Sequence, residues 1–200
     1  MCHEGRRVAR ALLAALVLAD LACVTLVSWH PGVAREHGPL ESLQALGLLL
    51  AALGFLGAGA PGQPRSLHAL GWSLALFCLT FFLLEFDTRP FGIEPLTRLT
   101  NGPVRDAWLA GLWLAMAGVV LARWRAVWAT FRGWLATPSG GAMVAAGAFW
   151  LLSQALETGP FQDVLGPHFL EELMEVNAVL LMLAAGVLAR RCARRPPAAH

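Results

Sequence analysis

Hydrophobic residues run along this chain in long stretches, separated by short segments rich in glycine, proline and charge. A helix needs about 20 apolar residues to cross the hydrocarbon core of a bilayer. Six stretches approach or reach that length, at residues 11–29, 39–60, 68–86, 104–122, 140–158 and 169–189. The pattern therefore predicts an all-α fold, a polytopic transmembrane helix bundle that forms one integral membrane domain over residues 1–200.

The connection between the fourth and fifth stretches has a period of its own. Its large apolar residues recur at i, i+4, i+7 and i+11 among three arginines: Trp124, Trp128, Phe131 and Leu135, with Arg123, Arg125 and Arg132. This spacing predicts a short interfacial helix at 123–135, with aromatic rings at the headgroup level and arginines near anionic lipid. The simpler interpretation is an aromatic belt that only fixes the depth of the protein in the bilayer.

Arginine is distributed unevenly between the segments that connect the stretches. With the N-terminus inside, eleven of the 15 arginines fall on the cytoplasmic side and four, Arg35, Arg89, Arg98 and Arg105, on the outer side. Because arginine-rich connections stay in the cytoplasm, the six-span topology predicts that both termini are cytoplasmic.

Composition narrows the class of protein. Charged residues make up 14% of the chain and hydrophobic residues 57%, whereas soluble domains carry about 25% charged residues. The absence of lysine from the sequence excludes a lysine Schiff base and a phosphate-loop lysine. A net charge of +2 does not suggest nucleic acid as a partner. An arginine-rich, lysine-free composition suggests a GC-rich bacterium, so we expect the bacterial inner membrane, with the lipid bilayer as the surrounding medium.

Two stretches carry small residues on one helical face, which lets helix backbones approach closely in lipid. The faces are Gly47, Ala51, Gly54 and Ala58 in the second stretch, and Gly111, Ala115, Gly118 and Ala122 in the fourth. Such contacts could form within one chain or between chains, so a homo-oligomer or a membrane-protein partner stays open.

Acidic residues gather on the predicted outer side, which holds eleven of the 13, while Glu4 is cytoplasmic and Asp20 lies near mid-membrane. Asp20 is either a proton-titrating residue in a translocation path or a neutral acid that is hydrogen-bonded to a neighbouring helix.

The last stretch opens with the densest group of candidate ligands. His168, Glu172 and Glu175 are spaced i, i+4, i+7 and share one helical face, with Glu171 beside it. Carboxylates with an imidazole suit a divalent metal ion, which makes these three residues a candidate metal site. The alternative is a helix start whose Glu171 and Glu172 favour the positive end of the helix dipole.

Other polar groups are expected at the same membrane level. They are Glu85, Asp87 and Arg89 after the third stretch, Arg105 and Asp106 at the fourth, Ser153, Gln154 and Glu157 in the fifth, and Glu41 and Gln44 in the second. They could line a shared outward-facing cavity, or serve as independent interfacial anchors and ion pairs.

The order Glu85-Phe86-Asp87 after an apolar span, with Glu171-Glu172-x-x-Glu175 in the last span, resembles a group of uncharacterised multi-pass bacterial inner-membrane proteins. Many members carry arginine before the first acid, where this chain has Leu84. The resemblance implies that Glu85, Asp87, Glu172 and Glu175 belong to one site, and it implies no activity.

Three functions fit these patterns, and no catalytic or cofactor-binding residue is predicted beyond the candidate metal ligands. The first is a non-enzymatic protein whose outward-facing acidic site binds a cation or small cationic solute, for transport or sensing. The second is a membrane-embedded metal-dependent lipid hydrolase, in which a carboxylate and histidine site would activate water. The third is a structural subunit that binds other membrane proteins.

Overall fold

The computed structural model describes residues 2–29, 39–59, 64–85, 94, 97–98, 102–158 and 167–193. Within them the chain forms seven helices and no strand: α1 (Cys2–Trp29), α2 (Pro39–Ala58), α3 (Arg65–Glu85), α5 (Gly102–Ala122), α6 (Trp124–Leu135), α7 (Pro138–Thr158) and α8 (Pro167–Ala193). All except α6 are long and apolar enough to cross a membrane. The predicted all-α fold with six candidate spans is therefore confirmed.

The ends of the helices differ most from the prediction where charged segments flank an apolar span. α1 begins at Cys2 and α8 continues to Ala193, because a helix satisfies its own backbone in water as well as in lipid. Hydropathy marks only the part of a helix that suits the hydrocarbon.

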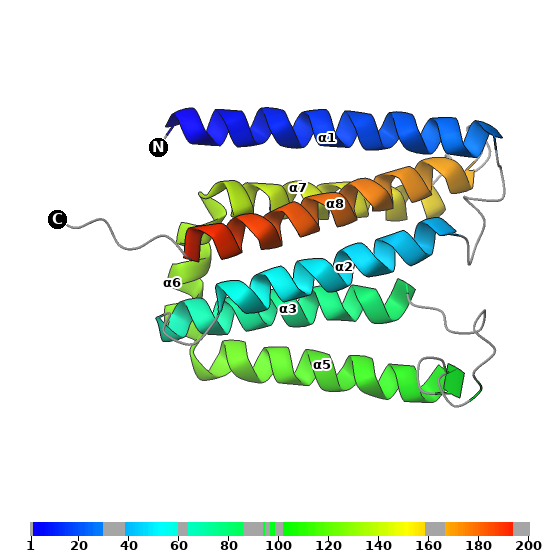
Figure 1. The fold of residues 1–200 in the computed structure, drawn as a ribbon. Coiled ribbons are helices and arrows are strands. Elements are labelled where there is room, and N and C mark those ends of the chain that lie inside the picture. Colours follow the sequence, from blue (N-terminus) through cyan, green and yellow to red (C-terminus); the bar gives the residue numbers. More distant parts are fainter. Residues whose placement is uncertain are drawn as a thin grey trace.

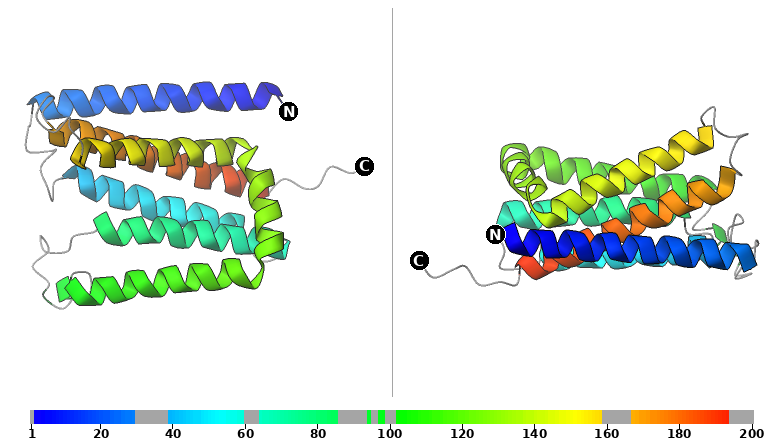
Figure 2. Two further views of the ribbon diagram at one scale, coloured as in Figure 1. Left: turned by 180° about the vertical axis from the view of Figure 1, so that it is seen from behind. Right: turned by 90° about the horizontal axis from the view of Figure 1, so that it is seen from above.

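The six long helices lie side by side and alternate in direction, so α1 begins and α8 ends at the same end of the bundle (Figure 1). The short α6 crosses this end and links α5 to α7 (Figure 2). We call it the basic end, because its described arginines are Arg7, Arg10, Arg65, Arg123, Arg125, Arg132, Arg190 and Arg191. The opposite end, where α2, α5 and α8 begin, is the acidic end; it carries Glu41, Asp106, Glu171, Glu172 and Glu175.

The core of the bundle is formed by α2, α3, α7 and α8, whose buried residues include Phe55 and Cys78. α2 and α8 run in the same direction and approach most closely at two glycines. A Cβ atom on Gly54 would lie 2.7 Å from the carbonyl carbon of Gly186, and one on Gly186 would lie 2.7 Å from the carbonyl oxygen of Ala51. The small face of the second stretch thus packs within the chain.

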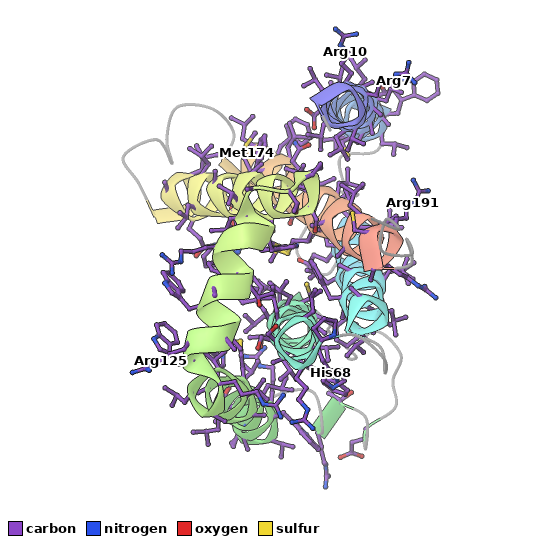
Figure 3. The ribbon with its side chains drawn as sticks, turned by 90° about the vertical axis from the view of Figure 1, so that its left-hand side faces the viewer. Arg7, Arg10, His68, Arg125, Met174 and Arg191 are labelled. Atoms are coloured by element: carbon purple, nitrogen blue, oxygen red, sulfur yellow. The ribbon has the colours of Figure 1, made fainter. Side chains whose placement is uncertain are left out.

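α1 and α5 lie at opposite edges of the bundle (Figure 3). None of the residues of α5 is buried. Its small face is also open, since a Cβ atom on Gly111 or Gly118 would meet no described atom within 4 Å. The two small-residue faces, similar in sequence, therefore have different surroundings.

Helix α6 confirms the short helix expected at 123–135. Its aromatic residues form a continuous row, in which the rings of Trp124 and Trp128 stack with centroids 5.4 Å apart and Arg132 lies 5.7 Å from the ring centroid of Trp128. Trp134 points into the bundle. It donates a hydrogen bond of 3.0 Å to Ser139 Oγ, which donates in turn to the carbonyl oxygen of Ala185 at 2.8 Å. This chain of hydrogen bonds ties α6, α7 and α8 together.

We expect Gly54→Ala to destabilise the bundle, because its methyl group would overlap the α8 backbone rather than a flexible side chain. Overpacking of this kind costs about 1–3 kcal/mol. The measurement is thermal unfolding of the purified protein in detergent. Gly111→Ala is the matched control, since it adds the same methyl group to a span at a place with no described neighbour. Equal unfolding temperatures for both variants would contradict the packing described here.

Candidate functional site at the acidic end of α8

The first part of α8 carries three polar side chains, each of which bonds to a different neighbouring helix. Glu172 accepts a hydrogen bond of 3.1 Å from Gln44 Nε2 on α2. Glu175 accepts one of 2.9 Å from Ser153 Oγ on α7. Asn177 Nδ2 donates one of 2.7 Å to Asp20 Oδ1 on α1. At about 1.5 Å per residue, these three positions span only about 7.5 Å of helix, so α8 joins three helices within a short depth.

The uncharged partners in these pairs are deeply buried. Gln44 is 2% exposed and Asn177 1%, and Ser153 is fully buried. Around them lie apolar side chains such as Leu40 and Leu173, which pack together beside Cys23 of α1. A polar group in such surroundings costs free energy unless it is hydrogen-bonded. The pairing explains how amides are accommodated inside the bundle.

Two buried oxygens nevertheless accept no hydrogen bond from any described residue. They are Gln44 Oε1 and Asn177 Oδ1. The amide nitrogen of Asn177 is already engaged, because it donates both to Asp20 and to the carbonyl oxygen of Leu173 at 3.0 Å. The same end of the bundle also holds one buried donor without a hydrogen-bond partner among the described residues, Arg105 Nε on α5.

Negative charge is concentrated around Glu172. The carboxylates of Glu175, Glu41 and Glu171 lie near enough to repel its charge. Arg105, at the same end, lies on α5, where its Nε is 4.0 Å from Asp106 Oδ1. Since α5 packs mainly on α3, this arginine and Asp106 form a separate contact and do not belong to the group around α8.

The structure brings together part of the site expected from the sequence. Glu172 and Glu175 lie close together on α8, but they bond to different helices, α2 and α7. Asp20 is hydrogen-bonded to a neighbouring helix, in agreement with one of its two interpretations. Asp87, Arg89 and the side chains of Glu85, Glu157 and His168 lie outside the described residues.

The metal site stays a prediction. Among the described residues, no group of three or more histidine, cysteine, aspartate or glutamate side chains could hold a metal ion. The expected ligand His168 has a side chain outside that part of the chain. The convergence of Glu85 and Asp87 with Glu172 and Glu175 likewise stays a prediction.

Sequence reasoning placed Gln44 and Ser153 at the right level but did not identify them as partners of the α8 acids. The signal that could have found them is an uncharged polar side chain inside an apolar span, because such a group needs a partner in lipid. The sequence does not show which helix packs against each face of α8.

We expect Asp20 and Asn177 to be energetically coupled, because Asn177 donates a hydrogen bond to Asp20 between two candidate membrane spans. Asp20→Leu and Asn177→Leu should each destabilise the protein, and the double variant should lose less than the sum of the two. Couplings of this kind average about 0.6 kcal/mol in membrane bundles and reach about 1.7 kcal/mol. The measurement is a double-mutant cycle of unfolding in mixed micelles. Strict additivity would contradict the pairing.

Comparison of this chain with known protein families, curated proteins and solved structures finds no match.

Proposed function

We propose that this chain is a bacterial inner-membrane protein that binds a cation or a small cationic solute at the acidic end of α8, for transport or sensing. The observation that supports this most is Gln44 Oε1, a buried carbonyl oxygen that accepts no hydrogen bond from the described residues and belongs to the amide bonded to Glu172. Carbonyl and carboxylate oxygens are the ligands of hard cations, and they also accept hydrogen bonds from ammonium and guanidinium groups.

The charge around the site favours the same class of ligand. The carboxylates of Glu41, Glu171 and Glu175 lie near enough to that of Glu172 to repel its charge. A cleft lined by one sign of charge attracts ligands of the opposite sign, and low-dielectric walls strengthen that field. A cation would both supply the missing partner of Gln44 and reduce the repulsion between the acids.

The distribution of arginine indicates on which side of the membrane the α8 site lies. The basic end carries eight described arginines, whereas Arg98 and Arg105 lie at or near the opposite end. Under the positive-inside rule, the basic end with both termini faces the cytoplasm. The α8 site then lies on the outer side of the bundle.

A partner-binding role is a second candidate, and α5 is the observation that favours it. This helix has no buried residue along its length, and a Cβ atom on Gly111 or Gly118 would meet no described atom within 4 Å. Small residues on an open face let another helix approach closely. The two candidates use different helices, so the binding experiment below tests the cation site alone.

We expect one or more members of a panel of cations to bind the purified wild-type protein and raise its unfolding temperature. The panel is Na⁺, Ca²⁺, Mn²⁺, Zn²⁺, methylammonium and guanidinium, with affinity measured by calorimetry. Glu172→Gln removes the charge at the centre of the acidic group and should weaken binding by about tenfold or more, as expected for loss of a charged hydrogen-bond partner. Gln44→Leu should have a similar effect.

Asp106→Asn is the matched control. It removes one negative charge from the acidic end, but from α5, where Asp106 is exposed beside Arg105. It should leave affinity nearly unchanged. Equal losses in Asp106→Asn and Glu172→Gln would show that only general surface charge attracts the ligand, and no binding by any member of the panel would reject the proposal.

The orientation predicts which side reacts with a membrane-impermeant maleimide. Cys192 is exposed on the last turn of α8, while Cys23 and Cys78 are buried. In a Cys2→Ser background, Cys192 should be labelled in inverted vesicles and protected in intact spheroplasts. Arg98→Cys, combined with Cys192→Ser, places an exposed thiol at a segment near the acidic end and should give the reverse pattern. Labelling of Cys192 in spheroplasts would contradict the orientation.

A further inference from the structure

A cavity of about 550 Å³ lies between α3 and α5 near the basic end, at the opposite end of the bundle from the α8 site. This volume is in the range of sites that hold small molecules. Its walls are largely apolar, and polar groups stand at one end. Their arrangement points to the chemistry of an occupant.

The cavity exists because the residues that α5 presents there are small, with Val119 the largest of them. Toward the acidic end, the rings of Phe77 and Trp113 meet with centroids 6.5 Å apart and fill the space between the two helices. Toward the basic end, α5 contributes Ala115, Gly118, Val119 and Ala122. A Cβ atom on Gly118 would find no described atom within 4 Å. Small residues bring α2 and α8 together, but here they leave an apolar hollow beside the bilayer, which an acyl chain can enter.

The polar groups of the cavity are His68 and Arg123. Nη1 of Arg123 donates to the carbonyl oxygen of Arg65 at 3.5 Å, so this side chain reaches from the α5–α6 junction to the start of α3. His68 lies on the side of α3 that faces away from α7 and α8 (Figure 3). Its ring Nδ1 is hydrogen-bonded to the carbonyl oxygen of Gly59, and the ring lies 6.1 Å from that of Trp72. The cationic side chain of Arg123 therefore lies at the end of the apolar hollow that is expected to meet the lipid headgroups.

Charge at this end favours an anion. Arg65 and Arg123 flank the cavity, and no described side chain at the basic end is acidic. Basic pockets between membrane helices bind the headgroups of anionic lipids. We propose that this cavity binds an anionic phospholipid, with an acyl chain between α3 and α5 and its phosphate against Arg123.

A second copy of the chain fits the cavity less well. Two copies in one membrane, related by a two-fold axis, would present the same surface to each other. Their basic ends would lie in the same leaflet, which would bring the arginines of the two cavity mouths to the same level. A lipid phosphate pairs with Arg123, whereas a second copy adds positive charge beside it.

The experiment is native mass spectrometry of protein taken from nanodiscs that contain equal amounts of phosphatidylglycerol and phosphatidylethanolamine. We expect the wild type to retain phosphatidylglycerol preferentially. Gly118→Leu adds a side chain to the hollow at a place where a Cβ atom would meet no described atom within 4 Å, and it should abolish retention of either lipid. Arg123→Gln should lower the preference for phosphatidylglycerol by about fivefold, the effect of one arginine near an anionic lipid.

Two controls make the result specific. Gly111→Leu adds the same side chain to α5 at a glycine that does not line the cavity, and Arg125→Gln removes an arginine that points away from the bundle (Figure 3). Both should retain lipid as the wild type does. Inorganic phosphate added at millimolar concentration should not displace the lipid, because it has no acyl chain.

The proposal is overturned if Gly118→Leu keeps the lipid, if Arg125→Gln loses as much preference as Arg123→Gln, or if inorganic phosphate displaces the lipid. It is also overturned if the wild type leaves the nanodisc as a dimer that Gly118→Leu converts to a monomer, because a second copy would then occupy the cavity. Should Gly118→Leu fail to fold, Arg123→Gln and Arg125→Gln still decide the result. The outcome is independent of cation binding at the α8 site.

Discussion

Contact between the backbones of α2 and α8 is the constraint on which the bundle depends. In lipid, apolar side chains gain little by leaving the solvent, because the solvent is itself apolar, so helices associate through close packing and polar contacts. Gly54 and Gly186 permit that packing because neither has a Cβ atom at the contact. With α2 and α8 in this position, Gln44 lies within reach of Glu172, and α7 and α1 can each meet another side of α8.

The α8 site consequently joins three helices, α1, α2 and α7, to α8 through hydrogen bonds. Polar groups in a membrane are costly alone and modestly favourable in pairs, so each polar side chain on α8 selects the helix that can supply its partner. Ser153 and Asp20 hold α7 and α1 to α8 in this way. The same requirement makes the buried oxygens Gln44 Oε1 and Asn177 Oδ1 informative, because each accepts no hydrogen bond from a described residue although the nitrogen of the same amide is paired.

Much of the architecture can be predicted from sequence, because a bilayer makes length and hydropathy nearly decisive for the number of spans. The period of Trp124, Trp128 and Phe131 was also sufficient to identify α6. Lateral arrangement could not be predicted, since nothing in the pattern states which helices are neighbours. The two small-residue faces illustrate this: Gly54 faces a backbone and Gly118 faces open space. The pairing of Glu172 with Gln44 depends on the same missing information, although the type of each residue pointed to a polar contact.

The bond between Asp20 and Asn177 also has a consequence for biosynthesis. Asn177 follows Asp20 by 157 residues, so the first span enters the membrane well before its partner has been translated. During that interval a carboxyl group must be tolerated in lipid without its final contact, at about 2.5–3.5 kcal/mol for a charged aspartate at the bilayer centre. The span that contains Asp20 is the most apolar of the six. The high hydropathy of this span offsets the cost of burying Asp20. The span can therefore stay in the membrane at the edge of the bundle until α8 is inserted.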